Sequence, residues 1–139
     1  MRFWDSSAVV PLLIRQTTSA RADRWLGEDA AVALWTLTPV EVTSALRRLL
    51  RDGVLREEDS RHAELRATEL AAASHVVVDV DGVKSAAQRL LRVHALRAAD
   101  ALQLGAALVW AGGQGEGKVI HTLDDRLAVA ARREGFDVP

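Results

Sequence analysis

Hydrophobic positions along the chain follow two alternating patterns: short β-branched or aromatic runs, and longer stretches in which apolar residues recur with helical spacing. His75–Val80 is the clearest strand, since it is almost entirely β-branched. Thr38–Arg51 is a strong helix, with Pro39 near its start and Gly53 just after its end. Strands are predicted at Arg2–Asp5, Ala31–Trp35, His75–Val80, Lys118–His121 and, as a short stub, Phe136–Val138. Helices are predicted at 6–14, 18–27, 38–51, 56–73, 82–95, 98–111 and 123–134.

This order of elements predicts an α/β fold. Strands that are separated by helices pair in parallel, and the connecting helices cover both faces of the sheet. The expected architecture is a three-layer α/β/α sandwich with a central, mainly parallel sheet. The chain of 139 residues has no internal repeat and no convincing linker, so residues 1–139 are expected to form a single domain.

Composition excludes several classes of protein. Hydrophobic residues make up 49% of the chain and charged residues 27%, which is too apolar for a disordered protein. There is no cysteine, which excludes a disulfide framework and a zinc–thiolate site. No apolar run approaches the roughly 20 residues that span a bilayer, and the start of the chain lacks the apolar segment of a secretory signal. We therefore expect a cytoplasmic protein with no membrane partner.

The candidate chemistry consists of carboxylates at the junctions between strands and helices, where open parallel sheets bind their ligands. Asp5 ends the first predicted strand, where desolvation makes a lone carboxylate costly. Glu41 and Asp100 each lie in the first turn of a predicted helix, and Asp124 and Asp125 open the last helix. The sequence thus predicts a crevice that is rich in negative charge.

Most of these acidic residues also have a purely structural explanation. Acidic side chains stabilise helix N-termini by about 0.3–1 kcal/mol. Thr38 and Glu41 have the spacing of a capping box, and Thr122 and Asp125 resemble one. Taken singly, Glu41 and Asp125 are better explained as caps, whereas the two explanations are balanced for the other acids at helix starts.

Taken together, the carboxylates favour a metal site. Several of them in one crevice would repel one another, and helix N-termini offset only part of that repulsion. Hard oxygen ligands without histidine or cysteine suit Mg²⁺ or Mn²⁺. Such a site activates water and stabilises the charge on a phosphoryl group that is being cleaved. The residues alone therefore predict a metal-dependent hydrolase of phosphodiesters or phosphate esters.

The charge balance requires a local cationic patch if the substrate is a polyanion. Lys and Arg together number 18 and Asp and Glu 19, whereas proteins that bind nucleic acid through bulk electrostatics are usually basic. Most of the cations are arginines, which suit bidentate phosphate contacts. Arg48 follows Glu41 by two helical turns, so it either points along the crevice toward phosphates or belongs to a solvated helix end.

Four segments of the chain, in this order, resemble the PIN-domain family. They are Phe3–Ala8 (FWDSSA), Thr38–Val42 (TPVEV), Leu96–Leu104 (LRAADALQL) and Thr122–Leu127 (TLDDRL), and Ala130–Gly135 (AARREG) closes the pattern. The resemblance covers essentially the whole chain. It is strongest to the VapC-like toxins of type II toxin–antitoxin systems, which are small single-domain PIN proteins.

The resemblance implies an Mg²⁺- or Mn²⁺-dependent endoribonuclease that hydrolyses RNA phosphodiester bonds. It also implies a homodimer that is inhibited by a cognate antitoxin protein. The acidic quartet of the family falls on Asp5, Glu41, Asp100 and Asp124. In such a site Asp5, Asp100 and Asp124 would hold the metal, and Glu41 would hold or deprotonate a water molecule.

Four further residues are candidates for contact with RNA or for support of the metal ligands: Ser6, Arg48, Thr122 and Asp125. Thr122 matches the small hydroxyl residue that precedes the last acid of the family, and it would orient a water or a phosphate. Asp125 falls where the family is variable, so a cap or a supporting role is expected. His121 departs from the family, which more often has an apolar residue there.

Alternatives remain open at this point. The apolar faces of residues 42–70 serve either core packing or the binding of an antitoxin helix. A catalytically silent PIN-like module that binds RNA or protein is disfavoured, because it would have no reason to keep mutually repelling carboxylates. A response-regulator receiver is disfavoured because Asp5 stands alone at the end of its strand, and a haloacid-dehalogenase phosphatase because Ser7 replaces its second aspartate.

Overall fold

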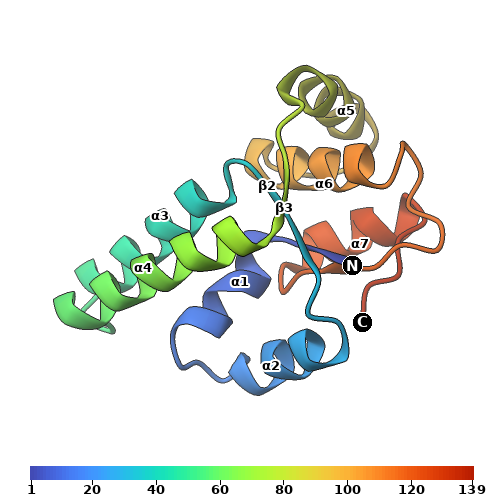
Figure 1. Cartoon of the computed structure of the whole chain (residues 1–139). Coiled ribbons are helices and arrows are strands. Elements are labelled where there is room, and N and C mark those ends of the chain that lie inside the picture. The colour runs from blue at the N-terminus through green and yellow to red at the C-terminus, as the bar shows by residue number, and fades with distance from the viewer.

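The computed structural model describes residues 1–139 and contains four strands and seven helices (Figure 1). The strands are β1 (Arg2–Trp4), β2 (Val32–Trp35), β3 (His75–Val77) and β4 (Ile120–His121). The helices are α1 (Ser6–Leu13), α2 (Ser19–Glu28), α3 (Thr38–Arg51), α4 (Glu57–Ala73), α5 (Val80–Val93), α6 (Ala98–Trp110) and α7 (Asp125–Arg133). All the predicted helices are present. None of them is both long enough and apolar enough to cross a membrane.

The strands form one sheet in the order β3–β2–β1–β4, and every neighbouring pair is parallel. Helices on both faces complete a three-layer α/β/α sandwich, which confirms the predicted fold class (Figure 1). The central strand β1 places Phe3 in register with Ala33 of β2 and with Ile120 of β4. The backbone N–H of Asp5 donates to the carbonyl of His121 at 3.0 Å. The ends of β1 and β4 therefore leave the sheet side by side.

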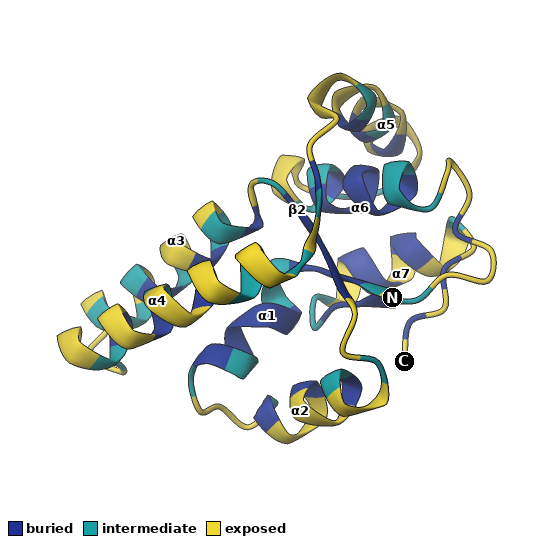
Figure 2. Cartoon of the chain, in the orientation of Figure 1, coloured by how far each residue is buried: buried dark blue, intermediate teal, exposed yellow.

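Side chains alternate between the two faces of the sheet, as the two-residue period of a strand requires. Trp4, Val32 and Leu34 are buried in one cluster with apolar residues of α1, α2, α3 and α4. Phe3 and Trp35 are buried in another cluster with residues of α5, α6 and α7. Figure 2 shows the buried sheet between helices whose outer surfaces are exposed. Both layers of helices are thus anchored by neighbouring positions of the same strands.

Helices α3 and α4 lie side by side and extend beyond the sheet (Figure 1). Arg47 of α3 joins them through ion pairs with Glu57 at 3.2 Å and Glu64 at 3.0 Å. Val42 and Leu46 of α3 are buried in the cluster that also contains Trp4. The first half of α3 is therefore held rigidly next to the end of β1, where the predicted site begins.

Two predicted strands differ clearly from the structure, whereas β1, β2 and β4 differ from the prediction by only one or two terminal residues. β3 ends at Val77, because Asp79 caps α5 by accepting a hydrogen bond from the backbone N–H of Gly82 at 2.9 Å. The predicted stub near the C-terminus is reduced to a single parallel bridge between Val119 and Asp137. Both differences lie away from the junctions that carry the candidate chemistry.

Candidate active site

The adjacent ends of β1 and β4 and the starts of α3 and α6 border a cavity of about 380 Å³. Its lining residues are Asp5, Ser6, Ser7, Val10, Glu41, Ser44, Ala45, Arg48, Ala99, Asp100 and Asp124. The structure thus brings together all four residues of the predicted acidic quartet, which come from four separate segments of the chain. Two of the further candidates, Ser6 and Arg48, line the same cavity.

Asp5 is the most deeply buried carboxylate of this cavity, with 4% of its surface exposed. Its Oδ2 accepts hydrogen bonds from the backbone N–H of Ser7 at 3.2 Å, from the Ser7 hydroxyl and from the Thr122 hydroxyl at 2.9 Å. Its Oδ1 accepts only from the Ser6 hydroxyl, at 3.3 Å. Burial raises the pKa of Asp5, although these donors act in the opposite direction.

Asp100 and Asp124 each use one carboxylate oxygen to cap a helix. The Asp100 Oδ2 accepts from the backbone N–H of Arg97 at 3.3 Å, and the Asp124 Oδ1 accepts from the backbone N–H of Leu127 at 2.9 Å. The second oxygen of each has no donor from the protein. Burial and the negative charge of Asp124 raise the pKa of Asp100. Capping and lining the cavity are therefore compatible roles for these two residues.

Glu41 does not cap its helix, so the capping box predicted from Thr38 and Glu41 is wrong. The residue at the cap position is Leu37, which makes no side-chain bond, and Thr38 is already helical. The Glu41 Oε2 instead accepts from the Ser6 hydroxyl at 2.9 Å, and its Oε1 accepts from the side-chain amide of Gln103 at 3.0 Å. Burial raises the pKa of Glu41, and the nearby carboxylates raise it further.

Asp125 lies outside the cavity. It is exposed in the first turn of α7 and lines a different hollow with Arg126 and Arg133. The predicted cap at Asp125 is wrong, because Asp124 takes that position. Thr122 is buried, and its hydroxyl donates to Asp5 and accepts the backbone N–H of Asp124 at 3.1 Å. It therefore links the Asp5 carboxylate to the backbone of Asp124.

Ser7 and Gln103, which bind carboxylates of the site, are absent from the sequence-based candidates. The Ser7 hydroxyl donates to Asp5 and accepts the backbone N–H of Leu123 at 2.8 Å. Gln103 is buried in α6 and contacts Glu41. The only signal for Gln103 in the sequence is a lone amide in an otherwise apolar helical run, and a buried amide requires partners that the sequence does not identify.

A model of the PIN-domain family matches residues 2–133. The chain belongs to the PIN-domain family. Ribonucleases VapC45 and VapC49, from two strains of Mycobacterium tuberculosis, are each 37% identical to this PIN domain over 137 residues. The matched residues cover 98% of the chain and 92% of each relative, which confirms the resemblance to VapC-like proteins.

Solved structures agree on the fold. The crystal structure of Mycobacterium tuberculosis VapC20, described as a toxin that cleaves the sarcin–ricin loop, matches with a TM-score of 0.68. It is 19% identical, and the match covers 94% of this chain and 95% of VapC20. At this level of identity the likeness supports the three-layer architecture of the PIN domain and nothing finer.

The donor set of this PIN domain fits a hard divalent cation in its chemistry. Asp100 and Asp124 each keep one oxygen without a protein donor, and Asp5 keeps one with a single long contact. A bound cation would relieve the repulsion that helps to raise the pKa values of Glu41 and Asp100. No three carboxylate or imidazole groups lie in an arrangement that would hold an ion, so these side chains would have to move closer together to share one.

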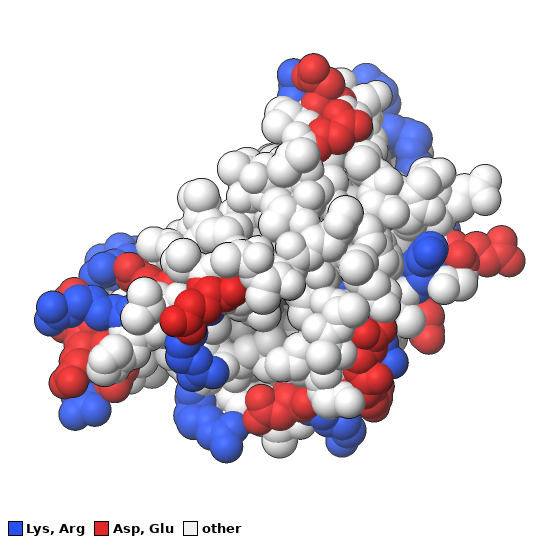
Figure 3. All heavy atoms as spheres, in the orientation of Figure 1, with Lys and Arg blue, Asp and Glu red and all other residues white.

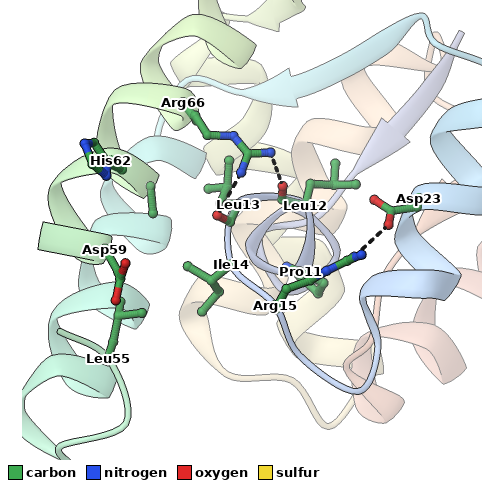
Figure 4. A pocket seen from close by; sticks show the side chains of 11 residues that line it. Pro11, Leu12, Leu13, Ile14, Arg15, Asp23, Leu55, Asp59, His62 and Arg66 are labelled. Atoms are coloured by element: carbon green, nitrogen blue, oxygen red, sulfur yellow. Dashed lines mark hydrogen bonds and ion pairs between the residues drawn. The ribbon is translucent and has the colours of Figure 1, made fainter.

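A second cavity of about 550 Å³ lies between the end of α1, α2 and α4 (Figure 4). Its lining residues are Pro11, Leu12, Leu13, Ile14, Arg15, Asp23, Leu55, Asp59, His62, Ala63 and Arg66. Arg66 of α4 reaches across to the end of α1 and donates to the carbonyls of Leu12 at 2.6 Å and Leu13 at 3.2 Å. These two hydrogen bonds satisfy carbonyls at the end of α1. They therefore fix α4 against α1 beside the cavity.

Replacing Glu41 with glutamine is expected to raise the Tm at pH 7 without divalent ions. The raised pKa means that the ionised carboxylate destabilises the folded state. A glutamine is neutral, and it can still accept from the Gln103 amide and donate to the Ser6 hydroxyl. Each ~1 kcal/mol of relief corresponds to about 3–5 °C in a domain of this size. The difference should shrink as the pH falls through the raised pKa, because Glu41 itself then becomes neutral. Thermal unfolding from pH 4 to pH 8 measures it.

Glu134→Gln is the matched control, with the opposite sign. Hydrogen bonds from Arg89, with a contact of 2.6 Å, hold the pKa of Glu134 below its usual value. This variant should therefore lower the Tm at pH 7, and the loss should fade as the pH falls through that lowered pKa. If Glu41→Gln and Glu134→Gln both lowered the Tm at pH 7, the inference that ionised Glu41 destabilises the folded state would be refuted.

Proposed function

We propose that this PIN domain, spanning residues 1–139, is an Mg²⁺- or Mn²⁺-dependent endoribonuclease that hydrolyses RNA phosphodiester bonds. It acts as the toxin of a toxin–antitoxin pair and is inhibited by a cognate antitoxin. The observation that carries the proposal is the convergence of four carboxylates, from four segments of the chain, on one cavity. The relatives VapC45 and VapC49, which are named ribonucleases, support the same substrate class.

In this proposal Asp100 and Asp124 would hold the cation through the oxygens that have no protein donor, and Asp5 through the Oδ1, whose only contact is long. When bound, a divalent cation supplies an acidified water and stabilises negative charge on the phosphoryl group. Glu41 accepts a proton from the attacking water at its carboxylate, a role that suits a group with a raised pKa. Arg48 lines the same cavity and binds a phosphate of the RNA.

The alternative is a catalytically silent PIN-like module that binds RNA or protein. The raised pKa values of Asp5, Glu41 and Asp100 argue against it, because they mark carboxylates whose ionised forms cost folding stability. Such a cost is expected where function requires the charges.

Purified protein, freed of antitoxin, is expected to cut total cellular RNA into discrete fragments with Mg²⁺ or Mn²⁺. EDTA should abolish cleavage, and Asp5→Asn should reduce it by at least about 100-fold, because the variant removes a charged ligand without changing its size. Asp52→Asn, at an exposed position at the end of α3, should cleave like the wild type. Gel analysis of the fragments measures each case.

The outcomes of this assay separate the two functions. Fragments that vanish with EDTA and with Asp5→Asn identify a metal-dependent ribonuclease and define its target. Cleavage that persists in Asp5→Asn reveals a contaminating nuclease, and assignment of the activity to this cavity then fails. Folded protein that cleaves nothing with either metal supports the silent module.

We propose that the cavity of Figure 4 receives a helix of the antitoxin. Apolar side chains of α1 and the region before α4, including Leu12, Ile14 and Leu55, line it, which suits the apolar stripe of an amphipathic helix. Part of the apolar surface predicted for residues 42–70 is instead core, since Val42 and Leu46 are buried. From the same range, Leu55 and Ala63 line this cavity.

Leu55→Glu is expected to weaken inhibition by the antitoxin encoded beside this chain by at least about tenfold, because it places a charge in an apolar contact. RNA cleavage by the variant without antitoxin should be unchanged. Leu65→Glu on α4 is the matched control, since Leu65 is 60% exposed and lies outside the cavity. Titration of the antitoxin into the cleavage assay measures both. Equal inhibition of Leu55→Glu and wild type would exclude this cavity.

We propose that the homodimer forms through an uncharged face of the molecule. Figure 3 shows this face with charged side chains confined to its margins. Four exposed apolar residues lie where β2 and β3 end and their following helices begin: Leu37, Val40, Val78 and Val80. The hydrogen bond from the Thr36 N–H to the Val77 carbonyl holds the two strand ends together. A cluster of exposed apolar residues of this kind marks an interaction site.

Sedimentation velocity is expected to show a dimer of the 15.1 kDa chain that Val40→Glu dissociates. Val40 is 64% exposed, so the substitution adds a charge at the interface and leaves the monomer folded. Val54→Glu, at a 72% exposed position after α3, should sediment like the wild type. A monomeric wild type, or a Val40→Glu dimer of unchanged affinity, would refute this interface.

A further inference from the structure

Gln103 is the polar exception in the helix that borders the site. Helix α6 is largely apolar, and residues 104–108 that follow Gln103 are all buried. The side chain of Gln103 is itself 1% exposed. Glutamine is rarely buried to this degree, because each amide atom that leaves water must find a hydrogen-bond partner. We therefore expect the amide of Gln103 to have a specific role.

The partners of that amide lie on α3. The Gln103 Nε2 donates to the Glu41 Oε1 at 3.0 Å and to the hydroxyl of Thr38 at 3.2 Å. Thr38 is buried and sits one helical turn before Glu41. Thr38 anchors the amide, and the amide in turn reaches the carboxylate that borders the cavity.

Glu41 differs from the other carboxylates of the cavity in how it is held. Asp5, Asp100 and Asp124 each have one oxygen tied to a backbone N–H near the start of a helix. Glu41 has no such backbone donor and depends on side chains of two other helices, Ser6 of α1 and Gln103 of α6. Its longer side chain would otherwise keep several rotamers, which lowers the fraction of time spent in a reactive geometry.

The Gln103 amide is an uncharged hydrogen-bond donor to Glu41. A lysine or arginine at position 103 would pair with Glu41 and favour its ionised form, which weakens it as a proton acceptor. An amide fixes the direction of one oxygen and leaves the negative charge uncompensated. The Ser6 hydroxyl, whose single proton is shared between Glu41 at 2.9 Å and Asp5 at 3.3 Å, extends the same neutral chain across the cavity.

We propose that Gln103 is a positioning residue of the ribonuclease: its amide, anchored by Thr38, holds the carboxylate of Glu41 in the orientation that accepts a proton from the attacking water. The inference rests on the proposed function. It assigns Gln103 no contact with RNA or with a cation, so its effect passes through Glu41 alone.

Gln103→Met tests this directly, because methionine keeps the unbranched shape and removes the amide. The expected result is a loss of about 10–100-fold in kcat with a KM for an RNA substrate within about twofold of the wild type. Leu108→Ala on α6 is the structural control. Leu108 is buried in the cluster that contains Phe3 and Trp35. Its truncation therefore lowers the Tm without lowering kcat at a temperature where the protein is folded.

A double-mutant cycle with Glu41→Gln separates positioning from general stability. If Gln103 acts only through Glu41, Gln103→Met causes no further loss of kcat in the Glu41→Gln background. Thr38→Val should cause a smaller loss of kcat, because it removes the hydroxyl that anchors the Gln103 amide. Thr38→Ser, which keeps the hydroxyl, should have the kcat of the wild type. The threonine variants also keep the test valid if Gln103→Met does not fold.

Each outcome bears on the inference. Wild-type kcat in Gln103→Met or, if that variant does not fold, in Thr38→Val overturns it. An equal loss in the wild-type and Glu41→Gln backgrounds also overturns it, because the effect is then independent of Glu41. A wild-type protein that cleaves no RNA with either metal shows instead that the proposed function has failed, and the inference falls with it.

Discussion

The burial of the Asp5 carboxylate at the end of the central strand is the constraint on which the rest of the site depends. A carboxylate with 4% exposure is tolerable only because Ser7 and Thr122 supply donors to one of its oxygens. Those donors come from the start of α1 and the end of β4. The pairing of β1 with β4 therefore fixes both the fold at the carboxyl edge of the sheet and the position of the first acid.

The remaining aspartates show how one side chain serves stability and chemistry together. Asp100 and Asp124 each cap a helix with one oxygen and keep the other free of protein donors. Capping offsets part of the cost of bringing like charges together, because the helix N-terminus carries partial positive charge. Burial, together with the residual repulsion from Asp124, raises the pKa of Asp100. Such a site is stable enough to fold and still favourable for a cation.

Neutral hydrogen bonds rather than ion pairs organise the cavity. The chain has many arginines, and several of them pair with acids elsewhere, such as Arg47 with Glu64 and Arg89 with Glu134. None of the four carboxylates of the cavity has an arginine partner; they are held by hydroxyls, an amide and backbone N–H groups. The negative charge is thereby concentrated in one place, while the net charge of the chain stays near zero.

The sequence by itself determined the order of strands and helices along the chain, the parallel α/β architecture and the presence of the four acids at the junctions. These features follow from periodicity and junction positions, which are local properties. It did not determine how each acid is held. Caps at Glu41 and Asp125 were expected, but Glu41 is bound by Ser6 and Gln103, which lie 35 and 62 residues away along the chain. Only the tertiary structure decided these partners, because the packing of α1, α3 and α6 around one strand end sets which polar side chains meet.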